Sequence, residues 1–339
     1  MIEADTIIVG GGPAGSTCAW KLKQAGRESI ILDKESFPRL KLCGGWITPH
    51  VVKDLELDIA AYPHRFLTFE RIHFHFPRLG FSTRSNQHSI RRWEFDQWLL
   101  ERAGVPVYRH DVRDIRRDGG WYVIDGEYRA RHLVGAGGTR CPVYRSLFRE
   151  INPHPKYLQT ATLEQEFAYD YKERDCHLWF AHKGLPGYSW YVPKADGYVN
   201  VGIGAMSVQM KFSDKDIHDY WQELTAELER RGLVTGYAYQ PKGYSYFLRN
   251  PVQHAQVDNA YLVGDAAGLA TWDLAEGIGP AVRSSILAAE SIVTGKPYSL
   301  GSVTRYSAAN ALLAFPFKYL FINKSEAAAR RLKAEPAAG

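Results

Sequence analysis

The fold is decided by residues 7–15, Ile7-Ile8-Val9-Gly10-Gly11-Gly12-Pro13-Ala14-Gly15, together with Asp33, which closes the next apolar run. The order strand, glycine turn, helix, strand and acid is that of a dinucleotide-binding βαβ unit. Gly10 permits the tight turn, Gly12 lets the backbone approach a pyrophosphate, and Gly15 lets helix and strand pack closely. The helix N-terminus offers free N–H groups and a partial positive charge to the diphosphate. We therefore predict a Rossmann-type site in which the Asp33 carboxylate accepts both ribose hydroxyls.

The composition indicates an ordinary globular protein with one large or two moderate domains. Of 339 residues, 45% are hydrophobic and 23% charged, and the formal net charge is only +5. Basic and acidic residues are interspersed, so a nucleic-acid partner is not expected. The cysteines form no C-x-x-C pair, which argues against a metal site or disulfide framework and favours a reducing, cytoplasmic compartment. They are Cys18, Cys43, Cys141 and Cys176.

No signal peptide or membrane-spanning segment is expected from the sequence, because no apolar run reaches the roughly 18 residues that a spanning helix needs. The nearest is Ala311 to Ile322, which Pro316 and Lys318 interrupt. One interpretation is a C-terminal helix packed on the body of the protein. The other is peripheral contact with a membrane surface through aromatic side chains. These are Phe315, Phe317, Tyr319 and Phe321. The sequence gives no indication of the oligomeric state.

Alternating apolar residues predict strands in the middle of the chain. The segment 71–76 places His73 and His75 on one strand face, where they are expected to be solvated because no third metal ligand is nearby. The segment 187–206 predicts a hairpin that turns at residues 194–197. One helix interrupts these aromatic strands, and we expect Ser213 to cap it while Asp216 supports its first turn.

A second glycine motif lies far along the chain. Gly264-Asp265-Ala266-Ala267-Gly268 follows an apolar strand, and Gly277-Ile278-Gly279-Pro280-Ala281 leads into a helix. A carboxylate beside glycines at a buried strand end suits a polyhydroxyl chain. NAD would not need this second site, whereas the ribityl arm of FAD would use it. The two motifs together predict FAD as the cofactor.

With both motifs, residues 1 to about 300 resemble the glutathione-reductase-type FAD fold of aromatic hydroxylases, flavin halogenases and geranylgeranyl reductases. The resemblance implies that Asp265 holds the ribityl chain and that residues 277–279 lie near the flavin ring. It also implies that Asp33 holds the adenosine ribose, and that Arg92, in an R-x-x-F-D segment, lies near the cofactor. For Arg92, a surface charge at a helix start is the alternative.

Two segments are most similar to geranylgeranyl reductases. Phe37-Pro38-Arg39, followed by Cys43-Gly44-Gly45, resembles the segment that places a cysteine beside the flavin in that family. Tyr188-Ser189-Trp190-Tyr191-Val192-Pro193 is similar to the Y-x-W-x-F-P motif, with Val192 replacing the usual Phe. Halogenases carry W-x-W-x-I-P and a catalytic lysine that we cannot match here, so halogenation is disfavoured. Many aromatic hydroxylases have A-D-G where this chain has Ala136-Gly137-Gly138, and Gly137 supplies no carboxylate. This difference weakens an assignment as a hydroxylase.

We predict an α/β fold, a Rossmann-type FAD-binding domain with an inserted antiparallel β-sheet substrate domain. The FAD-binding domain takes residues 1–68, 89–157 and 255–300, the substrate domain takes 69–88 and 158–254, and a C-terminal helical segment and tail take 301–339. The predicted catalytic residues are Cys43, Gly44, Tyr188 and Trp190. The predicted FAD-binding residues are Gly10, Gly12, Pro13, Ala14, Gly15, Asp33, Lys34, Arg39, Cys43, Gly44, Arg92, Val112, Gly137, Gly264, Asp265, Gly277, Ile278 and Gly279. No metal is predicted.

The leading functional hypothesis is an FAD-dependent oxidoreductase that reduces carbon–carbon double bonds of a prenyl (geranylgeranyl-type) lipid or a prenylated small molecule. Flavin N5 would deliver a hydride to one carbon, with NAD(P)H or another reductant as electron donor. Cys43 would donate or steer the proton, unless it is only a buried thiol in a Gly-Gly turn. Lys194 could bind a lipid or diphosphate headgroup, although a hairpin-turn lysine is usually solvated. The alternatives are an FAD monooxygenase acting on an aromatic or apolar molecule, and a flavin-binding electron carrier.

Overall fold

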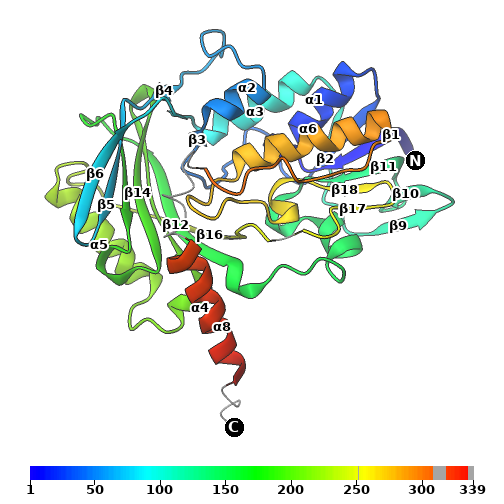
Figure 1. Cartoon of the computed structure of the whole chain (residues 1–339). Coiled ribbons are helices and arrows are strands. Elements are labelled where there is room, and N and C mark those ends of the chain that lie inside the picture. Colours follow the sequence, from blue (N-terminus) through cyan, green and yellow to red (C-terminus); the bar gives the residue numbers. More distant parts are fainter. Residues whose placement is uncertain (251, 308–317, 335–339) are drawn as a thin grey trace.

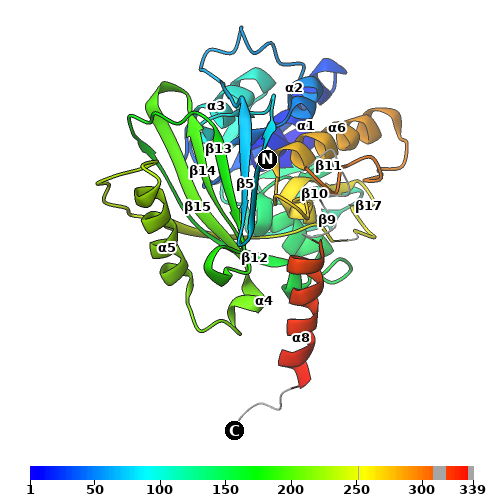
Figure 2. The ribbon, with the colours of Figure 1, turned by 60° about the vertical axis from the view of Figure 1, so that its left-hand side comes forward.

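A computed structural model describes residues 1–250, 252–307 and 318–334 of the chain. Two bodies of secondary structure lie side by side (Figure 1): a sheet covered by α1 and α6, and a large curved sheet that carries α5 on its outer face (Figure 2). Both are assembled from separated stretches of sequence. The predicted α/β architecture, a Rossmann-type domain beside a largely antiparallel sheet, is confirmed.

The first body is built on an eight-stranded sheet with β1 (Ile2–Val9) at its centre. β1 pairs in parallel with β2 (Ser29–Asp33) on one side and with β11 (Tyr128–Gly135) on the other. The sheet order is β17-β18-β11-β1-β2-β8, and β9 and β10 extend from β11. The other strands are β8 (Val107–Arg109), β9 (Ile115–Asp118), β10 (Trp121–Ile124), β17 (Gln256–Val257) and β18 (Ala260–Leu262).

Helices α1 (Pro13–Gln24) and α6 (Ile278–Thr294) lie against each other on one face of this sheet (Figure 1). Ile8 and Val134 of the sheet pack in one cluster with Cys18 and Leu22 of α1 and Ala288 of α6. Burial of these side chains removes apolar surface from water. It thereby holds the C-terminal ends of β1 and β11 beside the N-terminal ends of α1 and α6. The glycine turn of residues 10–15 and the second glycine motif at residues 264–268, more than 240 residues apart, thereby become neighbours.

The second body is a seven-stranded sheet of order β16-β12-β15-β14-β13-β5-β6. All its neighbouring pairs are antiparallel except β5 and β13, which run in parallel. The predicted hairpin is confirmed, with a turn at residues 195–197. The strands are β5 (Arg71–Phe76), β6 (Leu79–Arg84), β12 (Gln159–Ala168), β13 (Cys176–Phe180), β14 (Gly187–Lys194), β15 (Tyr198–Met206) and β16 (Lys242–Phe247).

Helix α5 (Ile217–Arg230) covers the outer face of this sheet with the buried side chains of Tyr220, Trp221, Leu224 and Leu228. Its cap differs from the prediction. Asp216 is the N-cap and forms a capping box with Asp219, while the Ser213 hydroxyl accepts from the Lys215 N–H and contacts the Tyr220 hydroxyl. Asp216 caps the helix because its carboxylate reaches two free N–H groups, those of His218 and Asp219.

The remaining elements lie outside the two main sheets. They are β3 (Trp46–Ile47), β4 (Leu67–Thr68) and β7 (His88–Ser89), α2 (Pro49–Asp54), α3 (Arg92–Ala103), α4 (Ser207–Met210) and α8 (Lys324–Ala334), and the short turns η1 (Gly138–Arg140), η2 (Tyr144–Phe148), η3 (Lys156–Leu158), η4 (His182–Gly184), η5 (Ala195–Gly197), η6 (Gly264–Ala267) and η7 (Lys318–Asn323). Helix α8 projects from the body (Figure 2).

The predicted membrane contact at residues 311–322 is only partly within the described chain. Phe315 and Phe317 lie outside the described residues, whereas Tyr319 is exposed and Phe321 is buried in the core beside the curved sheet. Among the helices that the structure describes, none has both the length and the apolar character needed to cross a bilayer.

Candidate active site

A cavity of about 980 Å³ lies where the two bodies meet, and both contribute to its walls. It extends from the glycine turn after β1 to the inner face of β12, β13, β14 and β16. Most of the predicted site residues line it, although they come from widely separated parts of the sequence. These are Gly10, Gly12, Pro13, Ala14, Asp33, Lys34, Arg39, Cys43, Gly44, Arg92, Val112, Gly137, Tyr188, Trp190, Asp265, Gly277 and Ile278.

Three predicted cofactor residues are not in the cavity wall but directly behind it. Gly15 packs against the Gly10 carbonyl, and Gly264, with φ +58°, packs against Ala281. The Gly279 N–H donates to Glu276 Oε1 at 2.7 Å. These three glycines support the wall from behind, and their contact with a cofactor stays a prediction.

The glycine end of the cavity has the features that a dinucleotide requires. Gly12 is the N-cap of α1, and within the described chain no side chain caps this helix, so its first N–H groups are available to an anion. Asp33 ends β2; its Oδ2 accepts from the Gly11 N–H at 2.6 Å and its Oδ1 from the Glu35 N–H at 2.9 Å. Both carboxylate oxygens are thereby oriented, and Asp33 tightens the glycine turn as well as facing the cavity.

The cysteine segment forms the middle of the cavity. Gly45 has φ +70°, and a Cβ at this position would lie 2.1 Å from the Ile90 carbonyl oxygen, so the turn requires glycine. The turn brings the half-buried Cys43 to the cavity wall, where its Sγ accepts from the Gly45 N–H at 3.4 Å. Cys43 and Gly44 therefore lie between the nucleotide end and the aromatic end.

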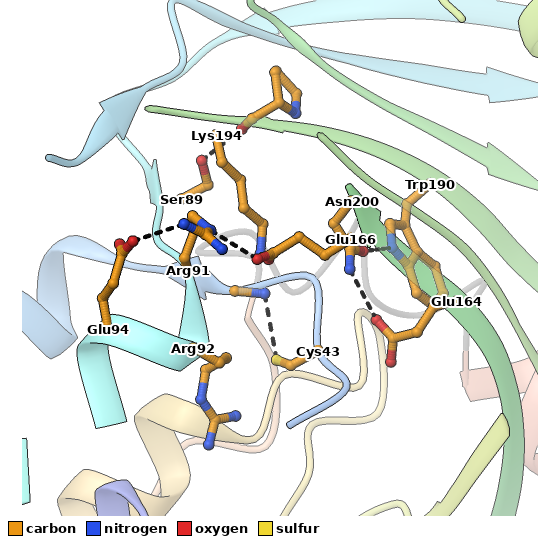
Figure 3. A network of polar contacts seen from close by, with 12 residues as sticks. Cys43, Ser89, Arg91, Arg92, Glu94, Glu164, Glu166, Trp190, Lys194 and Asn200 are labelled. Atoms are coloured by element: carbon orange, nitrogen blue, oxygen red, sulfur yellow. Dashed lines mark hydrogen bonds and ion pairs between the residues drawn. The ribbon is translucent and has the colours of Figure 1, made fainter. Parts of the chain in front are cut away.

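Arg92 begins α3 and is buried beside Cys43, as Figure 3 shows, so it is not a surface charge. Its guanidinium donates to both oxygens of the fully buried Asp96, at 2.6 and 2.7 Å. Burial opposes the charge of Arg92, but the Asp96 carboxylate outweighs it and, with Cys43, raises the pKa of Arg92. Arg39 joins the same carboxylate at 3.4 Å. Two cationic side chains, Arg39 and Arg92, thus border the cavity, and their charge suits an anionic cofactor.

The far end of the cavity is aromatic. Alternate residues of β14, Tyr188, Trp190 and Val192, face it, together with Leu178 of β13. The Tyr188 hydroxyl donates to the Leu274 carbonyl at 2.5 Å, and the Trp190 indole N–H donates to Asn200 Oδ1 at 2.6 Å. Burial raises the pKa of Tyr188 well above its usual range. Because protein groups already engage both polar tips, Tyr188 and Trp190 offer ring surface to a ligand rather than a proton.

One polar residue in this aromatic end was missed in the sequence. Glu164 of β12 lines the cavity, is 3% exposed, and accepts from Asn200 Nδ2 at 3.3 Å (Figure 3). Burial raises its pKa to about 7, against the opposing attraction of Lys41 and the bond from Asn200. The sequence shows Glu164 only as a charged residue within a strand of the aromatic region. It does not show which face of that strand points to a cavity.

Lys194 is neither solvated nor free for a headgroup, which corrects both interpretations of it. It is fully buried, and its Nζ donates to Glu166 Oε2 at 2.6 Å. Arg91 donates to the other oxygen of Glu166 at 2.9 Å and to Glu94 at 2.8 Å (Figure 3). This chain of ion pairs connects the hairpin to the start of α3, so Lys194 fixes the aromatic wall relative to the cysteine segment.

The residues of the cavity therefore fit FAD. The glycine turn, Asp33 and the α1 N-terminus suit the adenosine diphosphate part, and Asp265, which lies beside Gly277, suits the ribityl chain. The segment Cys43–Gly44 and residues 277–278 suit the flavin ring. The aromatic end then remains for an apolar substrate.

Comparison with known proteins agrees with this geometry. Residues 8–76 match a model of the NAD(P)-binding Rossmann-like domain, and residues 158–238 match the geranylgeranyl reductase catalytic domain. The chain is 30% identical to a menaquinone reductase of Mycobacterium tuberculosis, with 85% of this chain and 76% of that protein covered. It is 26% identical to digeranylgeranylglycerophospholipid reductase 2 of Methanopyrus kandleri, with 78% and 71% covered.

Solved structures share the fold. A geranylgeranyl bacteriochlorophyll reductase-like protein from Thermoplasma acidophilum superposes with a TM-score of 0.73 and 19% identity, covering 97% of this chain and 86% of that one. A flavin-dependent brominase superposes with a TM-score of 0.70 and 18% identity, covering 96% and 84%. At these identities the structures support the fold, and the sequence relatives support the type of enzyme. The chain belongs to the geranylgeranyl reductase family of FAD-dependent oxidoreductases.

Proposed function

We propose that this enzyme reduces carbon–carbon double bonds in the prenyl chain of a lipid or of a prenylated small molecule. The observation that carries the proposal is the continuity of one cavity from the dinucleotide turn, past Cys43, to a wall of Tyr188, Trp190 and Leu178. The menaquinone and digeranylgeranylglycerophospholipid reductases among its relatives also support a prenylated substrate. When bound and reduced, FAD supplies a hydride to one alkene carbon.

The aromatic end binds and orients the prenyl chain in this proposal. An isolated alkene has no polar handle, so it must be held by shape and apolar contact at reaction distance. The rings of Tyr188 and Trp190 are immobilised by their hydrogen bonds to Leu274 and Asn200. They therefore form a rigid wall that excludes water and loses little entropy when a ligand binds.

Cys43 is the proton donor that this arrangement favours. The second alkene carbon needs a proton when the first takes a hydride, so that the product gains two hydrogen atoms in all. The Cys43 thiol is half-buried between the two ends of the cavity, and its sulfur accepts from the Gly45 N–H and meets the Arg92 side chain. Both contacts leave the S–H proton available to a ligand in the cavity.

The test is anaerobic mixing of the dithionite-reduced enzyme with prenylated lipids and with their fully saturated counterparts. The lipids are a geranylgeranyl ether phospholipid and a menaquinol, whose reduced ring cannot itself oxidise the flavin. We expect flavin reoxidation and a gain of two hydrogen atoms per reduced bond with an unsaturated chain only. Absence of both with every lipid would overturn the proposal. An oxygenated product formed only in air would favour monooxygenase chemistry instead.

Glu164→Gln is expected to remove a pH dependence from KM. An apolar chain that displaces water from the cavity binds more weakly once Glu164 is ionised, because the carboxylate then loses its hydration. Above the pKa of about 7 of this carboxyl, wild-type KM should therefore rise by up to about tenfold per pH unit. In Glu164→Gln, KM should stay flat, and Glu150→Gln, an exposed surface change, should behave as wild type. A wild-type slope in Glu164→Gln would contradict this role.

The same variant has a stability signature with a defined sign. The folded-state pKa of Glu164 lies above the unfolded value of about 4.3, so the folded state binds the proton more tightly. The contribution of Glu164 to stability is present at low pH and is lost as the pH rises through about 7. The melting temperature of wild type should therefore fall relative to that of Glu164→Gln between pH 5 and pH 8.

A further inference from the structure

A cluster of histidines lies on the outer face of the curved sheet, on the side away from the cavity. In the parallel pairing of β5 and β13, His73 is the register partner of His177. Leu178 lines the cavity, whereas Trp179 packs in the cluster with α5, so the odd-numbered side chains of β13 face outward. The sequence shows only the pair His73 and His75; the parallel pairing adds a third histidine from about 100 residues away.

An acidic residue completes the set. One ligand atom each of His73, Glu173 and His177 lie within 4.8 Å of one another. His177 Nε2 is 3.9 Å from Glu173 Oε2, and the rings of His73 and His177 have centroids 4.3 Å apart. These three residues, the outer triad, come from β5, from β13 and from the loop that precedes β13.

The buried ring nitrogen of His177 lacks a partner. His177 is 7% exposed, and its Nε2 makes no hydrogen bond to any part of the chain that the structure describes. Buried polar atoms are rarely left without a partner, so this nitrogen indicates a ligand that it would meet. The half-buried carboxylate of Glu173 is the nearest acidic group to it.

The other ring nitrogens are held as they are in metal sites. His73 Nδ1 lies 2.6 Å from the Ser82 hydroxyl, and His177 Nδ1 lies 3.1 Å from His75 Nε2. With Nδ1 of both rings engaged, their Nε2 atoms are the ones left to bind an ion. A second carboxylate, Asp175 Oδ2, lies 3.4 Å from His73 Nε2 and adds negative charge.

Positive charge near the histidines must also be accounted for. Arg231, at the C-terminal end of α5, is close enough to His177 and His75 to affect their charge. Its guanidinium is bonded to Glu227 at 2.5 Å, a carboxylate that it shares with Arg230. Glu173 and Asp175 place two carboxylates beside the ring nitrogens of His177 and His73, and such negative charge favours a divalent cation.

We propose that His73, Glu173 and His177 bind a divalent transition-metal ion of the Zn²⁺ type. Two imidazole nitrogens and one carboxylate oxygen suit Zn²⁺, whereas Mg²⁺ and Ca²⁺ prefer oxygen ligands alone. The ion ties β5 to β13 and to the preceding loop, at the only parallel pairing of the curved sheet within the described chain. Because the sheet separates it from the cavity, it stabilises the fold and takes no part in the reaction.

The test is calorimetric titration of the untagged, chelator-treated full chain with Zn²⁺, and with Mg²⁺ as the comparison ion. We expect one Zn²⁺ per chain, no Mg²⁺ binding, and a Zn²⁺-dependent rise in melting temperature. Glu173→Gln and His73→Gln should each weaken Zn²⁺ binding by at least about tenfold. The matched control is His218→Ala, an exposed histidine on α5, which should bind as wild type.

Flavin content, measured in each variant, reports whether the chain is folded, independently of metal binding and of turnover. Glu173→Gln keeps the size of a half-buried side chain, so it tests the site even if His73→Gln does not fold. Absence of saturable Zn²⁺ binding to wild type would overturn the proposal. Equal binding by wild type and folded Glu173→Gln would overturn it as well, because the ion would then sit elsewhere.

Discussion

Gly15→Ala is expected to yield a protein that retains no FAD. A Cβ at Gly15 would lie 1.8 Å from the Gly10 carbonyl oxygen, a contact between two backbones that no side-chain rotation relieves. The Gly10 turn is fixed from its other side, since a Cβ at Gly10 would lie 2.5 Å from the Ala136 carbonyl oxygen. Helix α1 must therefore move away from β1, and its N-terminus leaves the position that faces the cavity. We expect the Kd for FAD to rise by more than about 100-fold, or about 3 kcal/mol.

The neighbouring residue gives a matched control. A Cβ at Gly11 would meet only side-chain atoms, those of Leu100 and Phe37 at 3.2 Å, which can shift slightly. Gly11→Ala should therefore keep FAD affinity within a few-fold of wild type. The measurement is flavin content after purification, followed by fluorescence titration of the apoprotein with FAD. A yellow Gly15→Ala protein of normal affinity would show that α1 does not depend on this close approach.

Cys43→Ala is expected to lose at least about 100-fold in kcat while it keeps its flavin, because a positioned acid contributes about 10²- to 10⁴-fold. The thiol lies at the cavity wall, between the dinucleotide end and the aromatic end. Alanine removes the S–H proton but leaves Gly45, whose φ of +70° determines the turn, in place. The backbone of the segment should therefore persist, and the loss should fall on proton delivery.

Two further variants separate chemistry from packing. Cys43→Ser keeps a small proton donor at the position and should recover part of the rate. Cys18→Ala alters a fully buried thiol of α1 whose pKa burial raises to about 12; it should lower stability but not kcat. Single-turnover reoxidation of the reduced flavin by substrate measures the step directly. A Cys43→Ala enzyme with the wild-type rate would leave Cys43 only a packing role in its glycine turn.

Features set by neighbours in the chain could be predicted from the sequence. The glycine turn after β1, the acid at the end of β2 and the hairpin around residues 195–197 depend on local backbone sterics and on strand periodicity. The helix cap shows the limit of this kind of inference. Ser213 and Asp216 are both good capping residues, and only the path of the chain decides which carboxylate or hydroxyl reaches the free N–H groups.

Features that depend on strand pairing could not be predicted. Glu164 faces the cavity because of the position of β12 in the curved sheet, and Lys194 is buried because Glu166 meets it from another strand. His73 was expected to be solvated, yet the β5–β13 register sets it beside His177. A single strand does not reveal its partner or its register, since both are decided by burial across the whole sheet.

The amino-acid sequence alone was thus sufficient to determine the FAD fold and the order of its cofactor motifs, because each motif is a local backbone requirement. The tertiary structure alone decided which polar groups lie together: Arg92 with Asp96, Lys194 with Glu166, and the outer triad on the far face. The physical reason is that a charge is kept in a folded core only where a partner satisfies it. For two of these three groups, that partner comes from a different strand or loop.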